Sequence, residues 1–409
     1  MNRRAPRWSE LRELIRPRPV DWSRTRRRLA AAASIEDLRQ LASKRVPKAV
    51  FDYTDGGAES ESSLRRCREA FARLEFVPRV LRDVSVVDTK TTVLGKASAL
   101  PMLFAPTGFT RMMNHQGEPA VARVAEQIGV PYVLSTLGTT SPEDLVRSAP
   151  AVDAWFQLYV WRDRGASLEL IDRVTASGYR VLVLTVDSPV AGARLRDVRN
   201  GLTVPPALTM KTILTSAVHP AWWMNLLTTE PLSFASLRSW EGTVADLMNK
   251  TLDPAVTLGD LDWLRSHWDG PLVVKGVQSA EDAKMVVEHG ADAVVVSNHG
   301  GRQLDRAPVP LEQLPCVLDA LGEGPEVYLD GGILSGGDIV AAVARGARAC
   351  LVGRAYLYGL MAGGQAGVRR AADLLHGDII RTMQLLGVNR LEELSPDAVR
   401  LPLPHGRSR

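Results

Sequence analysis

The feature that most constrains the fold is a series of short, fully apolar segments rich in β-branched residues. Most successive segments start about 20 to 30 residues apart, with amphipathic stretches of helical periodicity between them, which suits one strand, one helix and two loops per step. Strands that are apolar on both faces are typical of parallel sheets. The eight segments are Met102–Ala105, Tyr132–Ser135, Trp155–Leu158, Val181–Thr185, Leu272–Lys275, Ala293–Ser297, Val327–Leu329 and Ala349–Val352. They predict an α/β fold, a closed (β/α)8 TIM barrel.

The main alternative architecture is a doubly wound parallel sheet. That fold requires a Gly-x-Gly-x-x-Gly turn after an early strand, and the chain has none. Since a barrel takes about 250 residues, the 409-residue chain leaves room for flanking segments. We expect a basic tail at 1–33, the barrel domain at 34–395 and a second tail at 396–409. Helices and a short strand within the first 95 residues are expected to cap one end of the barrel.

The step from the fourth to the fifth segment is roughly 60 residues longer than the others. We expect a long functional loop there, at about 200–258. It contains the apolar stretch 221–227 with Trp222 and Trp223, which suits either a membrane interface or a lid or subunit contact. The arginine-rich tail is either solvated or attracted to an anionic membrane surface. Nucleic-acid binding is not expected, because no aromatic residues alternate with these arginines.

The number and spacing of the cysteines indicate the cellular compartment and whether a metal site is expected. The chain has three widely spaced cysteines, Cys67, Cys316 and Cys350. No Cys-x-x-Cys pair or histidine cluster accompanies them, so neither a metal site nor a disulfide framework is expected. No stretch approaches the roughly 20 apolar residues needed to cross a bilayer. We therefore expect a cytoplasmic protein, with peripheral contact at the inner face of the cell membrane as a further hypothesis.

Polar or glycine-rich residues end five successive apolar segments. In barrel enzymes the catalytic groups lie at the carboxyl ends of the strands and in the loops that follow. The five endings are Thr185-Val186-Asp187, Lys275-Gly276, Ser297-Asn298-His299, Asp330-Gly331-Gly332 and Gly353-Arg354. They predict an active site at this end of the barrel.

His299 and Arg302 are separated by two glycines, which let the backbone turn tightly beside a ligand. An imidazole accepts a proton near neutral pH, and a guanidinium binds a carboxylate through two parallel hydrogen bonds. The pair therefore favours an anionic substrate that loses a proton, although a histidine in isolation is more often structural.

Other strand-end residues support the same site. Asp187 could orient a protonated imidazole, or simply cap a helix. Lys275 at the end of an apolar strand needs an anionic partner, either a structural carboxylate or a reduced cofactor. The glycine pairs after the seventh and eighth segments match the place where barrels bind phosphate, and Arg354 adds positive charge. These residues predict a cofactor that carries a phosphate.

Together these residues resemble the FMN-dependent enzymes that oxidise 2-hydroxy acids: glycolate oxidase, lactate oxidase, mandelate dehydrogenase and the lactate dehydrogenases. The resemblance covers about residues 34–395, and its most specific part is Ser297–Asp305. The stretch 191–201 and the Trp222-Trp223 loop look most like those of the actinobacterial L-lactate dehydrogenases.

The resemblance implies a role for each candidate residue. The catalytic group would be His299, Asp187, Tyr159 and Lys275. The residues that hold the substrate would be Tyr53, Arg194 and Arg302 at its carboxylate and Tyr159 at its hydroxyl. The residues that bind FMN would be Pro106, Thr107, Gly108, Ser135, Gln157, Thr185, Lys275, Ser297, Asp330, Gly331, Gly332, Gly353 and Arg354. Ordinary core packing is the alternative for the two tyrosines, for Ser135 and for Thr185.

Three positions depart from the pattern of relatives. Leu137 and Gly108 stand where plant glycolate oxidase carries a tryptophan and an alanine, which alters the pocket volume and favours side chains larger than that of glycolate. Leu334 stands where many relatives carry an arginine that reaches the FMN phosphate. The departure leaves open how that phosphate is neutralised.

The resemblance implies oxidation of an L-2-hydroxy acid, with L-lactate to pyruvate as the leading reaction. His299 would act as the base, either on the carbon-bound proton or on the hydroxyl during hydride transfer. Electrons would pass to a quinone or a cytochrome. The alternatives are an oxidase that uses oxygen on glycolate- or mandelate-type acids and a flavoprotein that modifies a peptide, and Arg302 argues against the peptide. A non-catalytic binding module would not need all these residues together. A homotetramer is expected by resemblance.

Overall fold

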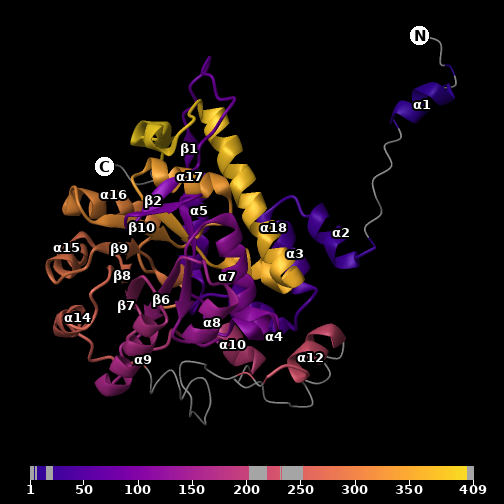
Figure 1. Ribbon diagram of the computed structural model, residues 1–409. Helices are drawn as coiled ribbons and strands as arrows, with labels where there is room; N and C mark the ends of the chain where they lie inside the picture. The colour runs from indigo at the N-terminus through magenta and orange to yellow at the C-terminus, as the bar shows by residue number, and fades with distance from the viewer. Residues whose placement is uncertain are drawn as a thin grey trace.

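The structure is a computed structural model, and it describes residues 4, 7–14, 22–201, 219–230, 232 and 252–402. Its centre is a closed barrel of eight parallel strands with helices around it (Figure 1). In order around the barrel the strands are β4 (Met102–Phe104), β5 (Tyr132–Ser135), β6 (Ala154–Leu158), β7 (Val181–Thr185), β8 (Leu272–Val277), β9 (Ala293–Val296), β10 (Glu326–Asp330) and β11 (Ala349–Val352). Each predicted segment overlaps one of these strands, so the predicted (β/α)8 fold is confirmed.

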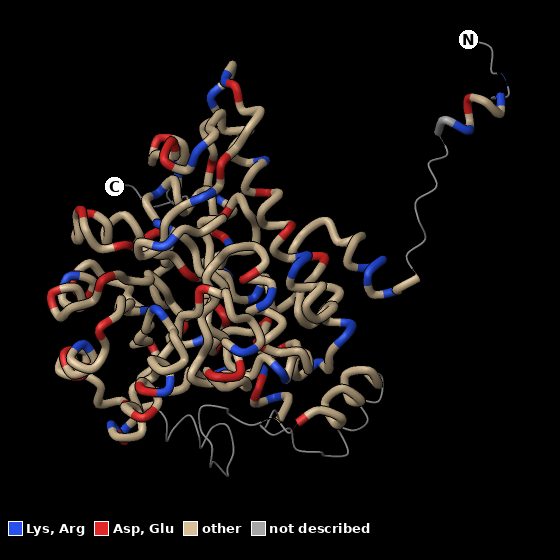
Figure 2. Tube along the Cα trace, viewed as in Figure 1, with Lys and Arg blue, Asp and Glu red and all other residues tan. Residues whose placement is uncertain are grey.

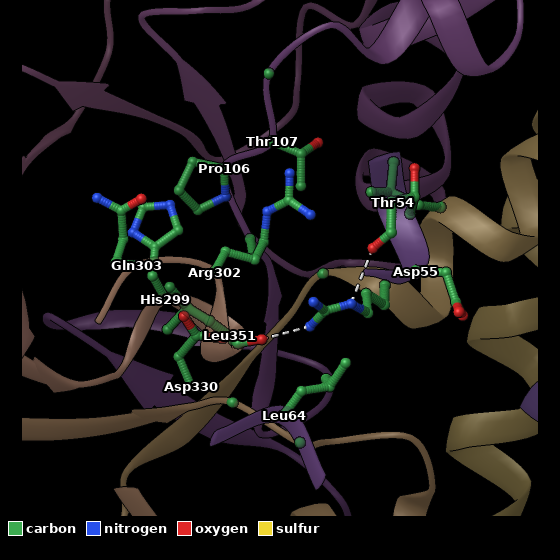
Figure 3. A pocket seen from close by; sticks show the side chains of 18 of the residues that line it. Thr54, Asp55, Leu64, Pro106, Thr107, His299, Arg302, Gln303, Asp330 and Leu351 are labelled. Atoms are coloured by element: carbon green, nitrogen blue, oxygen red, sulfur yellow. Dashed lines mark hydrogen bonds between the residues drawn. The ribbon is translucent and has the colours of Figure 1, made fainter. Parts of the chain in front are cut away.

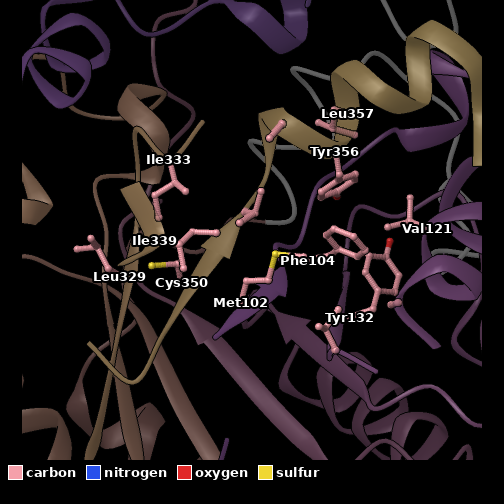
Figure 4. Packing of buried hydrophobic residues seen from close by; sticks show 14 of the residues in the cluster. Met102, Phe104, Val121, Tyr132, Leu329, Ile333, Ile339, Cys350, Tyr356 and Leu357 are labelled. Atoms are coloured by element: carbon pink, nitrogen blue, oxygen red, sulfur yellow. The ribbon is translucent and has the colours of Figure 1, made fainter. Parts of the chain in front are cut away.

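The barrel is filled and covered by apolar side chains. Inside it, Trp155 of β6 and Tyr328 of β10 meet edge to face, with ring centroids 6.0 Å apart. Outside it, Phe104 of β4 packs against Tyr356 with ring centroids 5.1 Å apart, next to the buried Tyr132 (Figure 4). Because both faces of every strand are buried in this way, the strands need continuous apolar runs.

The helices between the strands begin at the polar residues that sequence rules favour. Side chains of Ser141, Asp163, Ser279 and Ser335 each accept a hydrogen bond from the backbone N–H three residues later. Apart from one α-helix in the long loop, the described α-helices that follow β4 are α6 (Thr110–Met113), α7 (Gly117–Ile128), α8 (Pro142–Ser148), α9 (Arg164–Ala176), α10 (Leu195–Asn200), α14 (Leu258–Arg265), α15 (Ala280–Glu288), α16 (Pro310–Leu321), α17 (Gly336–Ala344) and α18 (Arg354–Leu386).

A hairpin closes the amino-terminal end of the barrel. It consists of β2 (Thr91–Val93) and β3 (Lys96–Ser98). The backbone N–H of Leu94 at its tip donates to the carboxylate of Glu326, 3.1 Å away, and Arg180 donates to the Leu94 carbonyl at 2.9 Å. Both partners lie where strands begin, so this end is sealed and the opposite end is left for a site.

Helices from the amino-terminal part cover the carboxyl end. They are α3 (Ile35–Ser43), α4 (Lys48–Asp55) and α5 (Ser62–Arg73). Asp305, in the loop after β9, accepts hydrogen bonds from the backbone N–H groups of Ser60 and Ser63 at 3.2 and 2.8 Å. Arg354 of α18 donates to the carbonyl of Thr54 at 2.9 Å. The cap is therefore attached directly to the loops that follow the strands.

Parts of the segments expected as tails contact the barrel domain. Helix α2 (Arg24–Ala31) buries Leu29 and packs against α18, where Arg370 donates to the Ala32 carbonyl at 2.7 Å. At the other end, β12 (Val399–Arg400) pairs with β1 (Glu75–Phe76). Helix α1 (Trp8–Leu14) is the remaining described element of the amino-terminal tail.

The long loop expected at 200–258 is described only in part. Residues 202–218, 231 and 233–251 lie outside the described residues. The described part includes α12 (Pro220–Leu227), which carries no charged side chain (Figure 2). Among the described helices none is both long enough and apolar enough to cross a membrane.

Helix α18 bends at Gly363 and Gly364, where the backbone leaves helical geometry. The bend brings the backbones of Gly359 and Gly367 together. A Cβ on Gly367 would lie only 1.9 Å from the carbonyl oxygen of Gly359. Glycine is therefore required at this contact.

We predict that Gly367→Ala lowers the free energy of unfolding by at least about 1–3 kcal/mol, because the methyl group overlaps a backbone carbonyl. Gly377→Ala is the matched control in the same helix, since a Cβ there meets no atom within 4 Å. It should instead stabilise the protein by about 0.5–1 kcal/mol through lower chain entropy. Urea unfolding followed by circular dichroism measures both, and equal effects of the two changes would contradict the proposed contact.

Candidate functional site

The carboxyl ends of the strands and the helical cap enclose a cavity of about 570 Å³. Figure 3 shows His299, Arg302, Pro106 and Thr107 around it. All but two of the candidate residues line it, namely Tyr53, Pro106, Thr107, Gly108, Ser135, Gln157, Tyr159, Thr185, Arg194, Lys275, His299, Arg302, Asp330, Gly331, Gly332, Gly353 and Arg354. The other two, Asp187 and Ser297, support residues that do. The fold therefore brings the whole candidate set together.

His299 and Asp187 form the central contact. The imidazole Nδ1 lies 2.8 Å from Oδ1 of Asp187, and the Ser188 hydroxyl lies 3.4 Å from the same nitrogen. Burial alone would raise the pKa of Asp187, but the positive charges of His299 and Lys275 hold it below its usual value. An ionised Asp187 orients the ring, leaves Nε2 for chemistry and stabilises the imidazolium that proton uptake would form.

The backbone at His299 is unusual. His299, Gly300 and Gly301 have φ angles of 57°, 62° and 73°, and such left-handed geometry costs energy at the histidine alone. Gly301 is also needed for space, since a Cβ there would lie 2.7 Å from the backbone nitrogen of Leu64. Three left-handed residues in succession turn the chain sharply, so that His299 and Arg302 reach the same cavity.

Lys275 is buried at the end of β8. Its ammonium lies 3.0 Å from the carboxylate of Asp330 and 3.1 Å from the hydroxyl of Ser297, which in turn donates to Asp330 at 2.8 Å. Burial disfavours the ammonium, but Asp330 and Asp187 raise its pKa above the usual value. The site thus contains a permanent positive charge, and the structural ion pair considered for Lys275 is present as well.

Arg302 and Arg194 flank the ring of Tyr53. Their guanidinium carbons lie 4.9 and 5.6 Å from the ring centroid. Burial and the nearby charge of Arg194 lower the pKa of Arg302 to about 10, which shows that two positive charges are held together at a cost. The carboxyl of Asp197 is near both, but burial raises its pKa and opposes its ionisation. A small carboxylate bound here would relieve this repulsion.

Tyr159 is buried and lines the same cavity. Burial, with a contribution from the negative charge of Asp187, raises the pKa of Tyr159 to about 12. The phenol is therefore neutral at physiological pH and able to donate a hydrogen bond to a substrate oxygen.

The wall formed by β5, β6 and β7 has buried polar atoms whose hydrogen-bonding capacity the described residues leave unused. Ser135 donates to Oε1 of Gln157 at 3.0 Å. Within the described part of the chain, Nε2 of Gln157 and the hydroxyl of Thr185 are buried without a hydrogen-bond partner. Buried polar atoms are rarely left unsatisfied. The polar edge of a flavin ring carries the donors and acceptors that would satisfy these two groups, so the residues present fit FMN.

At the glycine-rich end of the cavity, Arg354 does not make the contacts expected of a residue that binds a phosphate. Arg354 donates to the carbonyls of Thr54, Gly300 and Gly56 at 2.9, 2.9 and 2.8 Å, so three of its N–H groups hold backbone rather than point at a phosphate. Leu334 leaves the opposite wall without a charge. Arg68 of α5 lies beside it, with hydrogen bonds to the Gly332 carbonyl and to Asp338. Positive charge is therefore present, but from an element that the sequence did not indicate.

Sequence reasoning missed several residues of the site. Ser188 could have been found, since it directly follows the polar end of the fourth segment. Gln303 joins two loops through bonds to the carbonyl of Val190 and the N–H of Gly192, at 3.0 and 3.1 Å. Arg68 lies on α5, and no sequence signal singled it out. Arg196 lies within the stretch 191–201 that carried the resemblance, but no role was assigned to it.

A sequence model of the FMN-dependent dehydrogenases matches residues 42–401. The chain belongs to this family. FMN is therefore its cofactor, as the sequence predicted.

Known proteins similar to the chain are enzymes of 2-hydroxy acids. A Mycobacterium tuberculosis protein provisionally named L-lactate dehydrogenase is 55% identical over 97% of this chain and 96% of its own. L-lactate dehydrogenase of Caulobacter vibrioides is 42% identical over 89% of this chain and 96% of its own. The crystal structure of the monotopic membrane protein (S)-mandelate dehydrogenase is 39% identical, covers 91% of this chain and 100% of its own, and superposes with a TM-score of 0.87.

We predict that Arg302→Met weakens the binding of oxalate, a small carboxylate probe, by about 10- to 150-fold, because a charged hydrogen bond contributes about 1.5–3 kcal/mol. Isothermal titration calorimetry on the FMN-loaded protein measures the affinity. Arg199→Met removes the same charge from an exposed position of α10 and should change the affinity less than about twofold. Equal losses in the two variants would mean that net charge alone, not this clamp, attracts the anion.

Proposed function

We propose that the protein oxidises an L-2-hydroxy acid, with L-lactate to pyruvate as the leading reaction, and passes the electrons to a quinone. The observation that carries the proposal is the shared cavity of His299, supported by Asp187, and the Arg302–Tyr53–Arg194 cluster. A base beside an anion clamp suits a substrate that has a carboxylate and an ionisable hydrogen on the next carbon. The names of the relatives support the same reaction class.

Arg302, Arg194 and Tyr53 hold the substrate carboxylate in this proposal. Tyr159 donates to the substrate hydroxyl and fixes its orientation. His299 takes a proton, either from the carbon or from the hydroxyl, and Asp187 stabilises the imidazolium that results. FMN, when bound, supplies the two-electron acceptor. The closed amino-terminal end and the cap over the site limit the access of water to these charges.

The pocket wall points to a side chain larger than that of glycolate. Gly108 and Leu137 face each other there, and a Cβ on Gly108 would lie 3.1 Å from that of Leu137. The missing methyl group keeps space open on this side of the cavity. L-lactate fits the names of the curated relatives, and mandelate-sized acids remain the alternative suggested by the structural relatives.

Peripheral membrane contact through α12 is part of the proposal. From sequence, the Trp222-Trp223 stretch suited either a membrane interface or a lid or subunit contact. Trp222 is buried and donates to the carbonyl of Met112 at 2.9 Å. The exposed apolar residues of this uncharged helix are Met224 and Leu227. The name of the monotopic mandelate dehydrogenase supports a membrane-facing role. A homotetramer stays a prediction by resemblance.

We predict that L-lactate bleaches the flavin absorbance of the wild-type protein in the absence of oxygen. Replacing the base by His299→Gln should slow this bleaching by about 10²- to 10⁴-fold while FMN remains bound after gel filtration. His289→Gln is the control, since His289 directly follows α15 and pairs with Asp262 away from the cavity. Parallel rates with glycolate and (S)-mandelate identify the preferred side chain. A fully active His299→Gln variant would refute the assigned base.

We predict that the wild-type protein sediments with vesicles that contain phosphatidylglycerol, and that Met224→Glu combined with Leu227→Glu reduces the bound fraction several-fold. Charged side chains at these positions oppose insertion into the interface. Leu385→Glu alters an exposed leucine on α18 and should leave binding unchanged. If the double variant binds as well as the wild type, α12 is not the contact.

A further inference from the structure

A second, smaller cavity of about 220 Å³ lies next to the active-site cavity. Met113, at the end of α6, is part of the wall of both. Helix α6 follows directly after the loop of Pro106, Thr107 and Gly108, and the Thr110 hydroxyl donates to the Thr107 carbonyl at 3.2 Å. The two cavities are therefore separated by a single side-chain layer that is tied to the flavin-facing loop.

The wall of this second cavity combines apolar and polar groups. Trp222 and Leu226 of α12 form an apolar side. His115, Arg111 and Arg45 form a polar side. In the described part of the chain, Nδ1 of His115 is buried and has no hydrogen-bond partner, a state that buried polar atoms seldom keep without a ligand.

We infer that this second cavity binds the ring of a 1,4-quinone, the electron acceptor of the reaction proposed above. A quinone ring is planar and largely apolar, and its two carbonyl oxygens only accept hydrogen bonds. His115 offers one donor in the tautomer protonated on Nδ1, and the two arginines offer positive charge. A cavity of this volume takes one substituted ring and excludes a folded redox partner.

Charge and position favour this acceptor over others. Burial and the charge of Arg111 lower the pKa of His115, so the imidazole is neutral and suited to donate to a neutral ring. Arg111 and Arg45 stabilise the negative charge that develops on the quinone oxygens as electrons arrive. The cavity also lies directly under α12, whose exposed Met224 and Leu227 are the proposed membrane contact. A quinone from the membrane would thus have a short route to the site.

The redox step balances without another reactant. The quinone gains two electrons and two protons and leaves as the hydroquinone, while the reduced flavin loses the same electrons and protons. Electrons cross the layer that contains Met113. Protons reach the quinone oxygens through His115 and solvent. The carboxylic acid and the quinone therefore occupy different cavities, and neither has to leave before the other binds.

The test separates the two half-reactions by stopped flow on the FMN-loaded protein. His115→Ala removes the donor, and Asn225→Trp fills the cavity from α12. Both should leave flavin bleaching by L-lactate within about twofold of the wild type. Both should slow reoxidation of the reduced flavin by 2-methyl-1,4-naphthoquinone by at least about 10-fold. For His115→Ala this is the effect of one lost buried hydrogen bond, and for Asn225→Trp it follows from the loss of space for the ring. His219→Ala, at the start of the same helix but outside the cavity, should slow neither step.

Quinone binding also has a readout that does not depend on turnover. In the oxidised, substrate-free protein, the naphthoquinone should quench the fluorescence of Trp222, and Trp222→Phe should remove that part of the quenching. His115→Ala should weaken the titrated affinity by a similar factor. Quenching that oxalate abolishes would place the quinone in the active-site cavity and overturn the inference.

The outcomes distinguish this inference from the proposed function. If L-lactate does not bleach the flavin, the proposed substrate is wrong, and dithionite can reduce the flavin so that the quinone step is still measured. If His115→Ala and Asn225→Trp are reoxidised at the wild-type rate, the second cavity is not the acceptor site. Reoxidation by oxygen or cytochrome c alone would equally overturn it.

Discussion

Closure of the parallel barrel is the constraint on which the rest of the structure depends. Because all eight strands run in the same direction, every carboxyl end meets at one rim. Register then decides which side chains become neighbours, and Thr185 of β7 pairs directly with Lys275 of β8. The sealed amino-terminal end leaves the polar rim as the place where buried charges can meet a ligand.

The rim concentrates positive charge that the protein itself does not fully neutralise. Lys275 is balanced by Asp330, and His299 by Asp187. Arg302, in contrast, donates to backbone carbonyls of Tyr53 and Gly56, and its lowered pKa reflects burial near Arg194. A carboxylate that entered such a site would offset the cost of holding these cations together, and the proposed substrate carries one.

The barrel and most of the site could be predicted from sequence, because each depends on a local signal. Apolar runs mark buried parallel strands, and the polar residues that end them mark the rim. Ser188 lay one residue beyond that signal. The contacts of Arg68 and Gln303 could not be predicted, because they depend on how α5 and the loop after β9 pack in three dimensions. For Trp222 the sequence left a membrane interface and a lid or subunit contact both open, because the burial of its side chain depends on packing rather than on a local signal.

Arg354 and Leu334 illustrate why a motif does not specify the contacts of its residues. The sequence predicted that Arg354, at the start of α18, binds a phosphate. Its guanidinium nevertheless holds Thr54, Gly56 and Gly300 together, and this joins the cap to the left-handed turn at His299. The turn at His299 is held by Arg354, so it does not depend on the arginine that many relatives carry where this chain has Leu334. In the structure Arg354 therefore supports the turn that positions His299, whatever charge it also brings to this end of the cavity.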